Sequence, residues 1–185
     1  MRLFVALQTP AEIRALMASA KAALAASDAD VRWETDHKLH CTLRFLGEVD
    51  QSRVTSVIDV VDSASAQAKP LVIRYRDVGC FPNRHDPRVI WIGMEDAGGH
   101  LMNLQRMIED GLAAIGFEHE DRPFHPHVTL GRIKSQHNIG HLLRTMETVT
   151  FTAEPVTVRE IDVVRSELKP AGSVYTSLKL IPLRG

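Results

Sequence analysis

The apolar positions of the chain form short continuous runs, alternating segments and helical stripes. The run Leu3–Leu7 is short and continuously apolar, which predicts a strand over residues 2–8 that is buried on both faces. Thr9, Pro10 and Glu12 then form a capping-box pattern, with Thr9 at the N-cap. The residues that follow predict one helix whose buried face consists of Ile13, Leu16, Met17, Ala20 and Leu24.

The rest of the chain predicts three more helices and a series of short strands. Apolar residues three or four apart mark helices in the segments 54–61, 101–115 and 139–146, and Gly116 ends the second of these. The apolar phase changes between Val158 and Ile161, which predicts a β-bulge. Because strands and helices are intermixed, we expect an α+β fold. The expected strands are 31–34, 38–46, 71–75, 89–92, 125–133, 156–164 and 174–181.

Two of these strands carry the same order of residues: a histidine, one intervening residue, a threonine and a leucine. They are Leu39–Leu43 and Pro126–Leu130, and nearly half of the 185-residue chain separates them. Side chains alternate between the faces of a strand, so each histidine shares a face with its threonine. The spacing suggests two related halves that face each other across a cleft. On this pattern Arg44 joins the face of the first histidine, whereas Phe45 joins the apolar back.

The residues of these two segments fit acid–base chemistry on a phosphodiester. Two neighbouring imidazoles, His40 and His127, can be one neutral and one protonated close to neutral pH. One would take a proton from water and the other would protonate the departing oxygen, while Thr42 and Thr129 donate hydrogen bonds to the phosphate oxygens. This scheme requires no metal and no cofactor. The alternative is two half-exposed strands that carry histidines by chance, since the chain has nine.

Composition and charge indicate a soluble protein without a global attraction for nucleic acid. The chain is 44% hydrophobic and 24% charged, with a formal net charge of −1. The N-terminal apolar run is too short for a signal peptide or a membrane span. Cys41 and Cys80 form no paired motif, which favours a reducing compartment. We therefore expect one cytoplasmic, monomeric domain over residues 1–185 that has no membrane association.

The chain resembles the 2H phosphoesterases, and within them the RNA 2′,3′-cyclic phosphodiesterases, also called 2′-5′ RNA ligases. The resemblance covers almost the full length. A single His-x-Thr triplet is a weak signal, but two with these flanking residues and this spacing are a strong one. It is carried by the segments 1–7, 40–49, 81–82, 87–91, 124–132 and 166–168, and by Pro170, Gly172 and Tyr175.

The resemblance implies a bilobal, pseudo-twofold fold with two antiparallel-sheet lobes, outer helices and a central cleft. It implies hydrolysis of 2′,3′-cyclic phosphates, at RNA ends or on small cyclic nucleotides, to 2′-phosphomonoesters. By the family's assignment His40 is the proton donor and His127 the proton acceptor. The residues themselves do not choose between these two roles. Ligation that forms a 2′-5′ linkage is the same chemistry in reverse and stays open.

Several points stay open. Arg132 matches a phosphate-binding position of the family, but strict alternation places it on the back face unless Gly131 permits a bulge. Arg44 is a competing phosphate partner.

His125 and His127 could be taken as a metal pair, although zinc would need further ligands. A non-catalytic module that binds RNA ends is a further alternative, in which an aromatic residue would stack a terminal base. The candidate aromatic residues are Phe45, Phe81 and Phe124.

Overall fold

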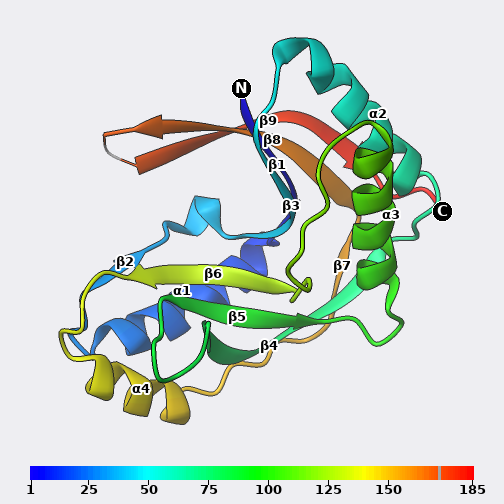
Figure 1. Cartoon of the computed structure of the whole chain (residues 1–185). Coiled ribbons are helices and arrows are strands. Elements are labelled where there is room, and N and C mark those ends of the chain that lie inside the picture. Colours follow the sequence, from blue (N-terminus) through cyan, green and yellow to red (C-terminus); the bar gives the residue numbers. More distant parts are fainter. Residues whose placement is uncertain (171) are drawn as a thin grey trace.

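Nine strands form two antiparallel sheets in residues 1–170 and 172–185, the part of the chain that the computed structural model describes (Figure 1). The first sheet has the strand order β3-β1-β8-β9 and the second has the order β2-β6-β5-β4-β7. The α+β fold with two antiparallel-sheet lobes is confirmed. The strands are Arg2–Gln8 (β1), Val31–Trp33 (β2), His40–Glu48 (β3), Leu71–Phe81 (β4), Val89–Glu95 (β5), His127–Ile133 (β6), Val156–Val158 (β7), Glu160–Lys169 (β8) and Gly172–Pro182 (β9).

Two pairs of helices cover the sheets. Helices α2 and α3 pack against each other and contact strands of the first sheet, whereas α1 and α4 contact each other beside the second sheet (Figure 1). No helix of the described residues is long and apolar enough to span a bilayer. The helices are Ala11–Ala25 (α1), Val54–Ser65 (α2), His100–Ala114 (α3) and Ile139–Thr148 (α4), with short 3-10 turns at Asp36–Lys38 (η1) and Gln51–Arg53 (η2).

Strand β1 is buried on both faces, as its continuous apolar run predicts. On one face, Leu3, Val5 and Leu7 belong to the main hydrophobic core. On the other face, Phe4 and Ala6 form a small apolar cluster with Val164, against which Tyr175 packs. This second cluster underlies the side of the first sheet that carries the histidine of β3. The central strand therefore joins the core to the floor of the site described below.

Two predictions about α1 are wrong in detail. The helix begins at Ala11 with Pro10 at the N-cap, and no side chain caps it, so the expected capping box at Thr9 does not form. The proline takes the N-cap position instead of the first helical turn, which moves the start by one residue. Leu16 is 49% exposed, so the buried stripe is narrower than its apolar spacing suggests.

The phase change between Val158 and Ile161 is a change of sheet, not a bulge. Strand β7 pairs with β4 in the second sheet, and β8 pairs with β1 and β9 in the first. The chain crosses between the lobes at Arg159. Beyond this crossing β8 and β9 form a long hairpin that projects from the first sheet (Figure 1). Its outer part lies beyond the strand ends predicted from the sequence.

Candidate active site

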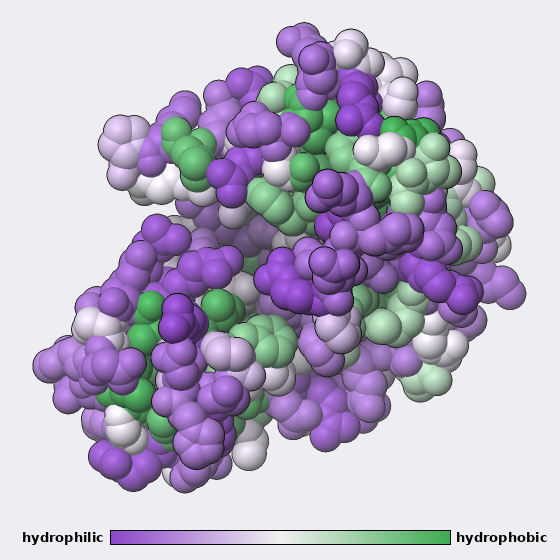
Figure 2. All heavy atoms as spheres, in the orientation of Figure 1, coloured by the Kyte–Doolittle hydropathy of each residue, from purple (hydrophilic) through white to green (hydrophobic). Residues whose placement is uncertain are grey.

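The two His-x-Thr segments line one cavity between the lobes. Its volume is about 690 Å³, and His40 and Thr42 on β3 contribute to its wall together with His127 and Thr129 on β6. Figure 2 shows the molecule hollowed between the β8–β9 hairpin and the lobe of the second sheet, with hydrophilic residues around the opening. The expected central cleft is therefore present, and it holds both motifs.

A backbone carbonyl fixes the tautomer of each histidine. His40 Nδ1 lies 2.7 Å from the carbonyl oxygen of Lys38, and His127 Nδ1 lies 2.6 Å from that of His125. A carbonyl oxygen only accepts hydrogen bonds, so Nδ1 carries the proton in both rings. The second nitrogen, Nε2, is therefore the one that faces proton transfer in each ring. In His40 this nitrogen lies 3.1 Å from the hydroxyl of Thr42.

Aromatic side chains hold the two imidazole rings in place. Phe4 stacks on His40 with ring centroids 4.8 Å apart, and the Tyr175 ring meets the same imidazole edge-on at 5.5 Å. On the other lobe Phe81 meets His127 edge-on at 4.9 Å. Each ring is therefore restrained by a hydrogen bond at Nδ1 and by aromatic packing, which limits the positions that Nε2 can take.

Burial lowers the pKa of both histidines below the ordinary value of 6.5, but the charges around them differ. For His40, the backbone carbonyl and then the carboxylates of Glu34 and Asp162 oppose this lowering of the pKa. For His127 only the backbone carbonyl opposes it, while Arg132, together with the neighbouring His125, lowers the pKa further. The carboxylates favour a protonated His40, although His127 opposes them by lowering the pKa of His40, whereas the Arg132 guanidinium favours a neutral His127.

A bulge follows the threonine in each motif strand. In the pairing of β1 with β3, two consecutive residues of β1 pair with Thr42 and Arg44. Leu43 therefore has no partner on β1 and is the inserted residue. In the pairing of β5 with β6, two consecutive residues of β5 pair with Thr129 and Gly131, so Leu130 is the inserted residue. An extra residue reverses the alternation of the side chains that follow it. The open question about the phase of the second strand is thereby answered, with Leu130 as the inserted residue.

The bulges bring a different side chain into the cavity from each lobe. Arg132 lines the cavity on the β6 side, and Phe45 lines it at the corresponding position of β3. The expectation that Phe45 lies on the apolar back is wrong, since its side chain is 44% exposed. The β6 lobe thus adds a cation to the cavity wall, and the β3 lobe adds an aromatic ring.

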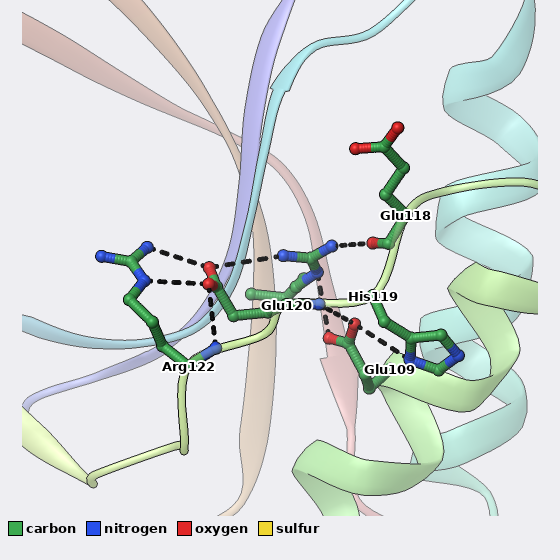
Figure 3. Close-up of polar contacts among 6 residues, drawn as sticks. Glu109, Glu118, His119, Glu120 and Arg122 are labelled. Atoms are coloured by element: carbon green, nitrogen blue, oxygen red, sulfur yellow. Dashed lines mark hydrogen bonds and ion pairs between the residues drawn. The ribbon is translucent and has the colours of Figure 1, made fainter.

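Arg44 does not reach the cavity, contrary to the expectation that it competes for the phosphate. The bulge turns it to the opposite face of β3, where its Nε lies 3.0 Å from Glu109 and its Nη1 lies 3.7 Å from Glu120. Its guanidinium also donates to the backbone carbonyl of Glu118. Figure 3 shows Glu109 on α3 and Glu118, Glu120 and Arg122 on the segment after it. This segment leads to β6, so Arg44 ties the first motif strand to the approach of the second.

Cys41 does not line the cavity, and of the suggested metal pair only His127 does. Cys41 is buried, and burial raises the pKa of its thiol to about 12, so the thiol stays protonated. It fills space behind β3, as the alternation predicts. Among the described residues, no three side chains of His, Cys, Asp or Glu converge in a way that could hold a metal ion.

Most of the basic residues of the cavity, and three of its aromatic residues, Phe4, Trp33 and Tyr175, were not among the site residues predicted from the sequence. Lys38 comes from η1 and Tyr175 from β9. The Lys38 Nζ lies 5.8 Å from the centroid of the Tyr175 ring. Arg2 and Lys169 also line the cavity, from β1 and from the tip of β8. Alternation with Phe4 could have indicated Arg2, but no local pattern indicates residues that a hairpin brings over the site.

Comparison with known proteins agrees with this geometry. A model of the family described as LigT like Phosphoesterase matches residues 7–91 and again residues 92–175. The chain belongs to this phosphoesterase family. The two matches correspond to the two halves that each carry one His-x-Thr segment. The 2H phosphoesterase resemblance and the enzyme class expected from the sequence are thereby confirmed.

Relatives of the family match the chain over nearly its whole length. A protein of Methanothermobacter thermautotrophicus named RNA 2′,3′-cyclic phosphodiesterase is 31% identical over 98% of both chains. One of the same name from Thermus thermophilus is 34% identical and covers 100% of this chain and 91% of its own.

Solved structures share the fold of this chain. The crystal structure of TT0787 of Thermus thermophilus has a TM-score of 0.85 at 31% identity, and it covers 100% of this chain and 99% of its own. Escherichia coli LigT complexed with 3′-AMP has a TM-score of 0.74 at 28% identity, with 100% and 98% covered.

Proposed function

We propose that this phosphoesterase hydrolyses 2′,3′-cyclic phosphates at RNA ends to 2′-phosphomonoesters. The observation that carries the proposal is the pair of imidazoles from two lobes in one cavity, each with Nδ1 held by a backbone carbonyl. The relatives named RNA 2′,3′-cyclic phosphodiesterase support the choice of substrate. The structure of LigT complexed with 3′-AMP supports a nucleotide as the kind of ligand.

The reaction needs one proton removed and one supplied. His127 Nε2 takes a proton from water as the water oxygen bonds to phosphorus. The bond from phosphorus to the 3′ oxygen breaks, and His40 Nε2–H protonates that oxygen. The product keeps its phosphate on the 2′ oxygen and gains a free 3′ hydroxyl. The carboxylates near His40 and the cation near His127 support this assignment of acid and base over the reverse.

The phosphate charge is stabilised by hydrogen-bond donors from both lobes. Thr42 and Thr129 supply hydroxyl groups on the cavity wall, and Arg132 supplies a guanidinium beside His127. Donors that are in place before the reaction stabilise the charge that develops on the oxygens in the transition state. In this scheme the protein side chains supply both proton transfer and charge stabilisation, so the proposal includes no metal ion.

The pH dependence of hydrolysis tests the proposal. For a 2′,3′-cyclic nucleotide, kcat/KM should rise with pH as His127 loses its proton and fall as His40 loses its own. Because burial lowers the pKa of His40 below 6.5, the fall should be well advanced by about pH 7.5. The two limbs report apparent values of the coupled pair. A profile that stays flat from about pH 5 to about pH 8 would contradict two-histidine catalysis.

A further inference from the structure

The cavity holds more positive charge than a cyclic phosphate requires. Five basic residues line it, and Glu34 is its only acidic residue within the described part of the chain. None of the five forms an ion pair with a carboxylate of residues 1–170 or 172–185, although the chain as a whole is slightly acidic. The five are Arg2, Arg32, Lys38, Arg132 and Lys169.

Four of these cations surround the space between the β8–β9 hairpin and the β2–η1 segment. Arg32 on β2 is the register partner of Arg132 on β6. Lys38 on η1 reaches the hairpin, where its Nζ lies 3.9 Å from the position that a Cβ of Gly172 would take. Lys169 ends β8 on the same side of the cavity. We call the space bounded by Arg32, Lys38, Lys169 and Tyr175 the hairpin groove.

The charge of the reacting group alone does not account for these residues. A cyclic phosphodiester carries one negative charge, and Arg132 beside His127 already opposes it. The other three cations repel one another in a cavity with low-dielectric walls, so an anion that enters the groove gains free energy. An RNA chain supplies such anions, since each further nucleotide adds one phosphate. A 2′,3′-cyclic phosphate lies at the 3′ end of its chain, so these phosphates precede it.

We propose that the hairpin groove binds phosphates of the RNA chain that precedes the cyclic end, so that the enzyme prefers oligonucleotide ends to cyclic mononucleotides. This inference rests on the proposed function. Exposed Phe45, with the Arg2 guanidinium 4.9 Å from its ring, also lines the cavity and offers a stacking surface there. The inference concerns the cations of the groove and does not depend on stacking at Phe45.

The test compares a cyclic mononucleotide with a short oligonucleotide that ends in a 2′,3′-cyclic phosphate. With two or three phosphates bound in the groove, kcat/KM for the oligonucleotide should fall about tenfold between about 50 and about 200 mM salt. The value for the mononucleotide should fall much less. The double variant Arg32→Ala, Lys169→Ala should lower the ratio of the two kcat/KM values about tenfold at low salt and flatten the salt dependence of the oligonucleotide.

The matched control removes one arginine and one lysine that are exposed away from the cavity, Lys69 and Arg159. Lys69→Ala combined with Arg159→Ala should leave the ratio and the salt dependence as in the parent. Equal kcat/KM values and equal salt dependence for both substrates in the parent would overturn the proposal that the hairpin groove binds RNA phosphates. The proposed function would then still stand. The same effect from the control variant would also overturn it. Failure to open either cyclic substrate would overturn both proposals.

Discussion

His40→Ala and His127→Ala are each expected to abolish measurable turnover of a 2′,3′-cyclic nucleotide. A positioned general acid or base contributes roughly 10² to 10⁴ in rate, and no other cavity residue carries a proton in the same place. The measurement is kcat/KM for a cyclic mononucleotide, with circular dichroism to show that the fold is kept. The double variant should lose little more than either single variant, because the two residues act in one step.

The control for this pair is a histidine outside the cavity. His141 is exposed on α4, so His141→Ala should keep the full parent activity. Retention of more than about a tenth of the activity in either catalytic variant would show that the imidazole supplies less than a general acid or base does. That result would count against the assignment of His40 and His127, even with the family membership intact.

Arg44→Ala should lower the free energy of unfolding by about 3–5 kcal/mol, because it removes the guanidinium that faces the buried Glu109 carboxylate and leaves that charge with only the backbone N–H of Glu120 and the ring of His119. The side chains of Arg44 and Glu109 are only 11% and 12% exposed. Denaturation by urea measures the loss. The double variant Arg44→Met, Glu109→Met should recover most of it, since neither charge then remains buried.

Arg122 provides the matched control, because it pairs with Glu120 in the same network but is 85% exposed (Figure 3). Arg122→Ala should cost at most about 1 kcal/mol. If Arg44→Ala were as mild as the control, and instead raised KM for a 2′,3′-cyclic nucleotide, Arg44 would be a phosphate ligand as the strand alternation first suggested. The geometry of the bulge at Leu43 would then be wrong.

The elements and the two motifs were predictable from the sequence because their signals are local. A continuous apolar run predicted β1, and helical spacing predicted α1 and α3 and most of their buried residues. Within each motif, His-x-Thr alternation gave the correct shared face, because two residues on one strand stay in phase over such a short distance. The likeness of the two segments also predicted two lobes with a cleft between them.

The features that the sequence did not reveal depend on partners far along the chain. The bulges at Leu43 and Leu130 exist only relative to β1 and β5, so the orientation of Arg44 and Phe45 could not follow from their own strand. The partner of Arg44 lies on α3, and packing alone brings it there. Likewise β7 and β8 look like one strand until pairing with β4 and β1 separates them.

The most direct test of the account follows the phosphorus atom itself. A solution of adenosine 2′,3′-cyclic phosphate, incubated with the chelator-treated parent enzyme, is monitored by phosphorus NMR. The account predicts that the cyclic signal is replaced by that of adenosine 2′-phosphate alone, at a rate that added chelator does not change. Formation of the 3′-phosphate, or loss of turnover that added metal restores, would contradict acid–base hydrolysis by His40 and His127.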